Sequence, residues 1–161
     1  MAMSAGRSAF VLDDDADEAT VIAAHQEGLR VVRGVLRRVW IDAISDRPWP
    51  QQAQDPLRAL LDLAALRHTG DTGIEVDVGD DDQFDLVVAL SPFTISAEGW
   101  AESDEQIYSA SDTGTSLWMA LTPREHSELR ERLLTRGADP NAVIPQPPRR
   151  RPWWTFSLTP A

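Results

Sequence analysis

The segment Ile74–Leu90 reads IEVDVGDDDQFDLVVAL and marks a change in the spacing of apolar residues along the chain. Apolar and acidic residues alternate over 74–78, and every second residue from Phe84 to Leu90 is apolar. Alternation of this kind is typical of a half-buried β-strand, and the intervening residues 79–83 are rich in turn formers. The sequence therefore predicts a β-hairpin with an acidic five-residue tip.

Helical spacing precedes this hairpin. Apolar residues recur at steps of three and four from Ile22 to Ala43, with acids before the stripe and arginines in its second half, as the helix dipole favours. We predict one long helix here, ended by Pro48 and Pro50. The pair Asp55–Pro56 resembles an N-cap followed by a proline at the first helical position, and it predicts a second helix.

Further strands are expected after the hairpin, at 93–100, 107–110 and 115–121, and their short connections favour an antiparallel meander. Thr122 and Glu125 have the spacing of a capping box and predict a helix that ends at Gly137. Ser8–Leu12 is apolar enough for a short strand near the N-terminus.

Together these patterns predict an α+β fold with two N-terminal helices, an antiparallel sheet of four to five strands, one capped helix and a C-terminal strand-like tail. At 161 residues the chain fits a single domain, 1–161. Within it, residues 145–161 form a tail that is rich in proline, arginine and tryptophan.

The charge of the chain is strongly one-sided. There are 26 acidic residues against 15 basic ones, all of them arginine, for a formal net charge of −11. Such a charge disfavours nucleic acid and anionic membranes as partners and favours a basic protein. Acidity that serves only solubility is the simpler alternative.

The sequence holds no motif that fixes an enzymatic activity. Without cysteine or lysine it cannot use a thiolate nucleophile, a P-loop lysine or a Schiff base. His25 lies on the apolar stripe of the first helix, where a packed core position is favoured over a ligand. An EF-hand loop starting at Asp77 fails because Asp82 occupies the position that needs glycine. We therefore predict no cofactor and no metal site, and a protein that is not an enzyme is favoured.

The chain lacks a run of 18 apolar residues and an N-terminal signal-peptide pattern. We expect a cytoplasmic protein with no membrane partner.

Two groups of residues are predicted to bind a partner. The first is the acidic hairpin tip with its flanking strand positions, because three adjacent aspartates exceed what a turn requires. Its members are Asp77, Asp80, Asp81, Asp82 and Asp85. The second group is Trp153 and Trp154, which follow Arg149–Arg151 and are too apolar to be left in water.

These features favour a small acidic non-enzymatic binding protein of the immunity-protein, antitoxin, chaperone or adaptor type that engages a basic protein partner. Two alternatives stay open. One is a structural subunit of a larger assembly that docks through the Trp-rich tail, and the other is an enzyme whose active site is dispersed in the sequence. The tail would also allow a homo-oligomer.

Overall fold

The computed structural model of the chain describes residues 6–148, and within them it has an α+β architecture. The strands are β1 (Ser8–Leu12), β2 (Leu36–Ile41), β3 (Ile74–Val76), β4 (Ser96–Ala101), β5 (Gln106–Ser111), β6 (Ser116–Leu121) and β7 (Val143–Pro145). The α-helices are α1 (Glu18–Val32), α2 (Gln54–Leu66), α3 (Asp81–Leu90) and α4 (Pro123–Thr135), and two short 3-10 turns are η1 (Gln51–Ala53) and η2 (Asp112–Gly114).

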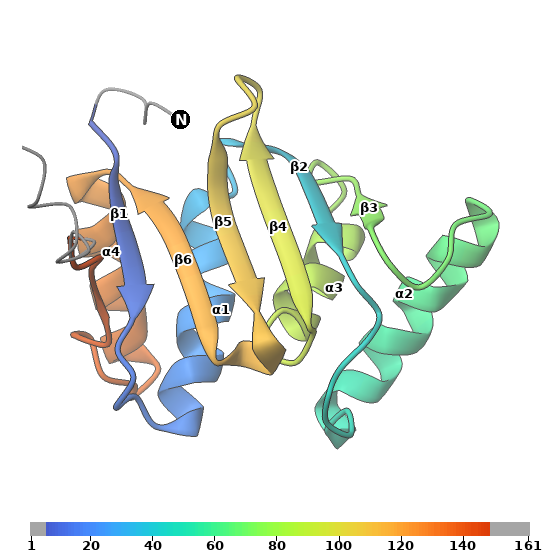
Figure 1. Cartoon of the computed structure of the whole chain (residues 1–161), viewed down its shortest axis with the longest axis horizontal. Coiled ribbons are helices and arrows are strands. Elements are labelled where there is room, and N and C mark those ends of the chain that lie inside the picture. The colour runs from blue at the N-terminus through green and yellow to red at the C-terminus, as the bar shows by residue number, and fades with distance from the viewer. Residues whose placement is uncertain (1–5, 149–161) are drawn as a thin grey trace, which may run out of the picture.

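All of these strands form one antiparallel sheet, in the order β3-β2-β4-β5-β6-β1-β7 (Figure 1). The centre, β4-β5-β6, is a meander with short connections. The N-terminal strand β1 lies between β6 and β7, so segments from the two ends of the sequence close one side of the sheet. The other side ends at β3.

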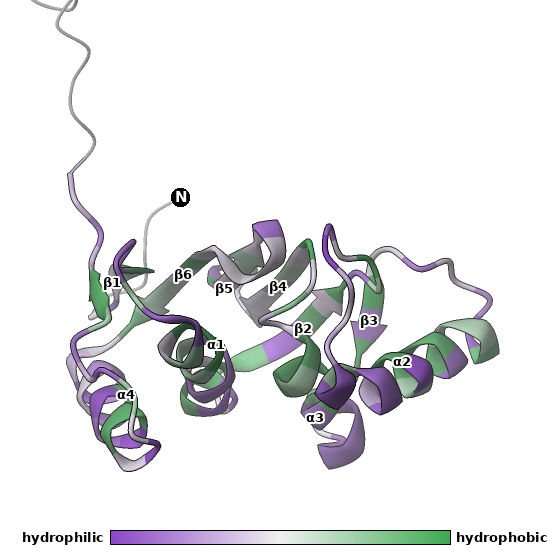
Figure 2. Ribbon diagram, turned by 90° about the horizontal axis from the view of Figure 1, so that it is seen from below, coloured by the Kyte–Doolittle hydropathy of each residue, from purple (hydrophilic) through white to green (hydrophobic). Residues whose placement is uncertain are grey.

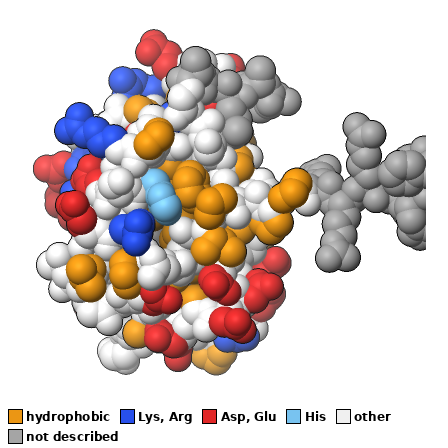
Figure 3. Space-filling model, turned by 90° about the vertical axis from the view of Figure 1, so that its left-hand side faces the viewer, with side chains coloured by type: hydrophobic (Ala, Val, Ile, Leu, Met, Phe, Trp, Pro, Cys, Tyr) orange, Lys and Arg blue, Asp and Glu red, His pale blue; other side chains and the backbone are white. Residues whose placement is uncertain are grey.

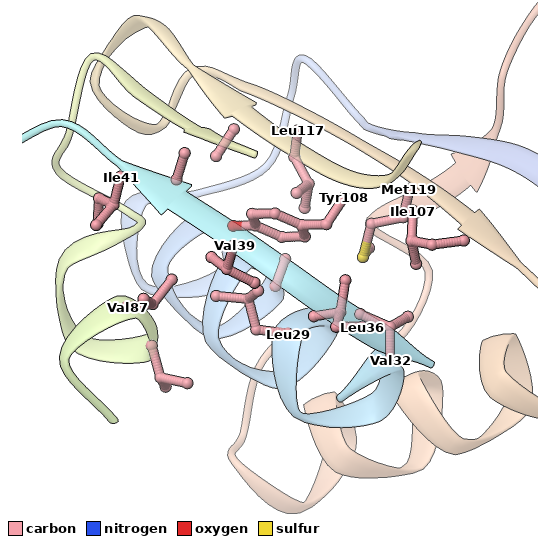
Figure 4. Close-up of a cluster of buried hydrophobic side chains, with 14 of the residues drawn as sticks. Leu29, Val32, Leu36, Val39, Ile41, Val87, Ile107, Tyr108, Leu117 and Met119 are labelled. Carbon is pink, nitrogen blue, oxygen red and sulfur yellow. The ribbon is translucent and has the colours of Figure 1, made fainter. Parts of the chain in front are cut away.

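The helices lie on one side of this sheet (Figure 2). There α1 packs between α4 and α3, and α2 packs against α3. The core fills the space between the helices and the sheet. Figure 4 shows Leu29 and Val32 of α1 facing strand residues such as Val39 and Met119. A register shift after Gly99 marks a bulge beside Ile107 and Tyr108, which are both fully buried in this cluster.

The prediction of a hairpin over 74–90 is wrong in its second half, because residues 81–90 form the helix α3. Apolar residues are so dense between Phe84 and Leu90 that they satisfy both a period of two and a helical period. The aspartates decide between the two. The Asp80 side chain is the N-cap and accepts a hydrogen bond from the Gln83 backbone N–H at 3.1 Å. The first strand of the predicted hairpin is confirmed over Ile74–Val76.

The first predicted helix is also too long. In the structure the helix α1 ends at Val32, and a turn around Gly34 leads into β2. In β2, Leu36, Val39 and Ile41 are buried while Trp40 is exposed. The apolar residues of β2 continue the spacing of α1 closely enough to resemble one helical stripe. The β-branched Val39 and Ile41 favour the strand.

The predicted fold class therefore needs correction: the described residues contain four α-helices and seven strands, not three helices and four to five strands. The broad α+β class is right. The strand at Ser8–Leu12 and the capping box of Thr122 and Glu125 are confirmed. The short strand β7 was missed, and the predicted strand-like segment of the tail lies outside the described residues.

Among residues 6–148, no helix combines the length and the apolar character that crossing a bilayer requires.

Candidate functional site

One face of the sheet carries no helix in the described part of the chain (Figure 2). One row of paired residues crosses all seven strands on this face. Because directly opposite residues in antiparallel strands point to the same side, the strand register identifies the row. In strand order the row is Glu75, Trp40, Glu98, Ser109, Trp118, Val11 and Ile144. We call the surface formed by this row and its outward-facing neighbours the open face.

Three tryptophans lie on the open face. Trp40 is 40% exposed, and Trp100 and Trp118 are half-buried. The rings of Trp40 and Trp100 lie against each other, with 4.8 Å between centroids and a tilt of 58°. The solvated face of an antiparallel sheet is ordinarily polar, so these large side chains are unusual there.

Charged groups lie beside two of these tryptophans, Trp40 and Trp100. Glu75 and Glu98 flank Trp40 in the row. The guanidinium of Arg38 lies 5.8 Å from the ring centre of Trp100 and forms an ion pair with Asp104 in the turn between β4 and β5. The open face thus presents flat aromatic surface next to carboxylates, and its arginine is already paired.

A groove of about 670 Å³ lies at the β1–β6–β7 end of the open face. It is lined by Trp118 and Ser109, by Gln106, and by Pro145–Pro148. The Trp118 indole N–H donates a hydrogen bond to the Gln146 side-chain oxygen at 3.2 Å. That bond fixes one edge of the indole and leaves its face to the groove.

Apolar surface also gathers at the adjacent edge of the molecule. Figure 3 shows hydrophobic side chains clustered around a histidine on the side where β1, β7 and α4 lie. Here the His126 ring stacks on Phe10 at 4.2 Å between centroids, and its Nε2 lies 3.1 Å from the Val143 carbonyl oxygen. Both contacts tie α4 to the edge of the sheet.

The aspartates predicted to bind a partner do come together, but around the start of α3 and not at a hairpin tip. Three of them have local roles. Asp80 is the N-cap, Asp77 accepts a hydrogen bond from the Gly79 N–H at 2.9 Å, and Asp81 pairs with Arg33 at 2.7 Å. The side chains of Asp82 and Asp85 are exposed and form no hydrogen bond or ion pair within residues 6–148. The hypothesis that these aspartates exceed what the local structure requires therefore applies only to Asp82 and Asp85.

The other predicted pair, Trp153 and Trp154, lies outside the described residues. Sequence reasoning missed Trp40, Trp100 and Trp118 as surface residues. In the sequence each of these tryptophans stands between apolar or small residues that face the helices, as Trp118 does between Leu117 and Met119. Because tryptophan is itself apolar, no alternation of polar and apolar residues marked these positions as outward-facing.

A second hollow, of about 400 Å³, adjoins the turn η2. Val21, Ile22 and Phe93 contribute to its apolar lining, and Glu18 and Arg47 are the ionisable residues that line it. Among residues 6–148, no group of three or more His, Asp or Glu side chains is placed to hold a metal ion.

The backbone of η2 is strained. Asp112, Thr113 and Gly114 have positive φ values of 56°, 57° and 89°. Buried His25 helps to hold this turn, since its Nε2 lies 2.9 Å from the Gly114 carbonyl oxygen and its Nδ1 lies 3.1 Å from the Tyr108 hydroxyl. Burial lowers the pKa of His25 to about 4, although the hydrogen bond to Gly114 opposes the shift. The ring is therefore neutral at pH 7, with Nε2–H as the donor to Gly114, and its role here is structural.

Over residues 6–148, fold and site together define an α+β architecture with a seven-stranded antiparallel sheet, in which one face is covered by helices and the other is open and rich in tryptophan. Comparison with protein-family models, with curated proteins and with solved structures gives no match.

Proposed function

We propose that this chain is a small acidic binding protein, without a catalytic role, that holds a basic protein partner on the open face of its sheet. Immunity proteins, antitoxins, chaperones and adaptors are proteins of this type. The observation that carries the proposal is the row of outward-facing residues, which contains Trp118 and contains Trp40 between the carboxylates of Glu75 and Glu98.

Tryptophan favours this interpretation because it supplies a large contact area with few rotatable bonds and is enriched among the residues that dominate interface energies. An exposed Trp40 beside Trp100 gives a partner an apolar surface to cover. Removing such a central side chain from an interface typically costs about 2 kcal/mol or more.

Charge favours a basic partner. All 26 acidic residues lie within the described part of the chain, whereas Arg149–Arg151 lie outside it. Glu75 and Glu98 place negative charge beside the aromatic surface. Complementary charge raises the association rate and disfavours acidic competitors.

The test compares three baits in affinity capture from a native lysate: the wild-type chain, the double variant Trp40→Ser/Trp118→Ser, and Leu134→Ser. Leu134 is a matched control because it is an apolar residue of α4, 65% exposed, on the helix side. We expect the wild type and the control to capture the same basic protein. The double variant should capture at least about tenfold less, because tenfold corresponds to only 1.4 kcal/mol.

Melting temperatures of all three baits establish that the comparison is between folded proteins. Equal capture by all three would contradict the proposal, since the open face would then play no part in binding.

A further inference from the structure

We propose that the hollow of about 400 Å³ beside η2 is a binding site for a free α-amino acid with a large apolar side chain. The hollow shares no lining residue with the groove of the open face or with its row of paired residues. This second site therefore does not rest on the proposed function.

Segments that are far apart in the sequence line the hollow. Pockets that bind small molecules in proteins have volumes of about 300–1,000 Å³ and are mainly apolar, with a few polar groups that fix the orientation of the ligand. The hollow has this size and this character. Its lining includes Val21 and Ile22 of α1, Pro48 and Pro50 of the loop after β2, Phe93 after α3, and Thr113 of η2.

Hydrogen bonds hold the walls of the hollow in place. The hydroxyl of buried Thr94 donates to the Asp42 carbonyl oxygen at 2.6 Å, and the Thr113 N–H donates to the Thr94 carbonyl oxygen at 3.1 Å. Thr94 thus links the loop after β2 to η2. On the other side, buried His25 holds η2 through the Gly114 carbonyl oxygen at 2.9 Å. A pocket that is already formed loses little conformational entropy when a ligand binds.

Two opposite charges lie at this hollow without partners. Glu18 and Arg47 both line it and are exposed, and neither side chain forms a hydrogen bond or an ion pair within residues 6–148. Arg124 is the only other arginine of the described residues whose side chain makes no such bond. Because Glu18 and Arg47 are not paired with each other, they suit a ligand that carries both an ammonium and a carboxylate.

Hydroxyl groups add donors on the side of Arg47. The Ser45 hydroxyl oxygen accepts from the Arg47 backbone N–H at 3.2 Å, and the Thr113 hydroxyl oxygen accepts from the Asp46 N–H at 3.4 Å. Within the described residues neither hydroxyl has an acceptor for its own proton, and both residues line the hollow. A ligand carboxylate can accept from these hydroxyls and from the planar guanidinium of Arg47. The carboxylate of Glu18 then accepts from the ligand ammonium.

The combination of charges and apolar surface selects the class of ligand. A ligand with one charge would leave either Glu18 or Arg47 without a counterpart, and a ligand without an apolar part would leave Val21 and Phe93 uncovered. An α-amino acid with a large apolar side chain meets all of these groups. L-Phenylalanine is a suitable probe, because its ring can pack against the ring of Phe93.

The first experiment titrates the ¹⁵N-labelled full chain with L-phenylalanine and follows the amide signals by NMR. We expect saturable shifts at Ile22, Gly114 and Thr115, and none at Leu129 of α4 or at Trp118 on the open face. Three analogues each lack one feature: 3-phenylpropionate lacks the ammonium, phenethylamine lacks the carboxylate, and glycine lacks the apolar side chain. Each should bind at least about tenfold more weakly. No saturable shift with L-phenylalanine, or equal affinity for any analogue, would overturn the inference.

The second experiment assigns the charges. Arg47→Gln should raise the Kd of L-phenylalanine at least about tenfold and leave that of phenethylamine nearly unchanged, since phenethylamine has no carboxylate. Glu18→Gln should do the same for L-phenylalanine and leave that of 3-phenylpropionate nearly unchanged. Arg124→Gln and Glu102→Gln are matched controls, because they remove the same charges from exposed, unpaired residues elsewhere.

Melting temperatures of the four variants establish that folded proteins are compared. If the control variants weaken L-phenylalanine binding as much as Arg47→Gln and Glu18→Gln do, the effect belongs to net charge and the site is not the hollow. The analogue series needs no variant, so it decides the inference even if a substitution disturbs the fold. Failure here leaves the proposed function standing, since that is judged by the capture comparison of Trp40 and Trp118.

Discussion

His25 shows how one residue links the core of this protein to its most strained turn. The side chain is fully buried, is bonded to the Tyr108 hydroxyl and the Gly114 carbonyl, and supports a turn with three successive positive φ values. The sequence pattern predicted a packed core position for His25, and this is confirmed. The pattern did not predict the turn that it holds, because Gly114 lies 89 residues away in the sequence.

Stability should depend on pH through His25. Its pKa is about 4 in the folded protein against an ordinary value of 6.5, so between these values the unfolded chain binds more protons. The contribution of His25 to the free energy of unfolding is therefore greatest above pH 6.5. It decreases by roughly 3 kcal/mol in all as the pH drops towards 4. Urea denaturation at pH 7.5, 6 and 5 tests this. His25→Gln, which cannot titrate, should show a flatter pH dependence, and parallel curves for the two proteins would contradict the assignment.

At the scale of elements, local signals were reliable where a side chain caps a helix. The capping box of α4 was predicted from Thr122 and Glu125 alone, and both of its hydrogen bonds are present. The apolar pattern was less reliable, since the run from Phe84 to Leu90 suits either a strand or a helix. The N-cap Asp80, interpreted as part of a turn, was the signal that could have identified α3.

The turn η2 gives a prediction at this scale. A Cβ added to Gly114 would lie 2.2 Å from the Pro92 carbonyl oxygen, and the backbone there has a φ of +89°. Gly114→Ala should therefore cost roughly 2–4 kcal/mol, from backbone strain and a clash together. Gly137→Ala is the matched control, because its φ is +73° but its added Cβ meets nothing within 4 Å. It should cost only about 1 kcal/mol in thermal or urea unfolding. Equal losses for the two variants would mean that Pro92 does not confine the turn.

At the scale of the whole molecule, the sequence could not predict which face of the sheet is open. That depends on strand order, and β1 pairs with β6 and β7 through contacts more than 100 residues apart in the sequence. The partner-binding surface proposed here follows from that order, since Trp40, Trp118 and Ile144 share a face only in this arrangement.

Association with a basic partner should depend on the two aspartates that have no local role. Asp82→Asn/Asp85→Asn should leave the melting temperature nearly unchanged and slow association, more at low salt than at high, because exposed charges act through screened long-range attraction. Asp14→Asn/Asp15→Asn removes the same charge from exposed positions between β1 and α1 and is the control. Stopped-flow kinetics across a salt series compares the two. Equal slowing would assign the effect to net charge alone and not to the start of α3.

The most direct test of the open face as the binding surface is an NMR titration that follows the indole N–H signals of the full chain as the captured partner is added. Trp40, Trp100 and Trp118 report on the open face, and Trp49, in the loop after β2, is the internal control. We predict that the three open-face signals shift or broaden in proportion to bound partner while the Trp49 signal stays in place. Unchanged Trp40, Trp100 and Trp118 signals at saturation would contradict the account.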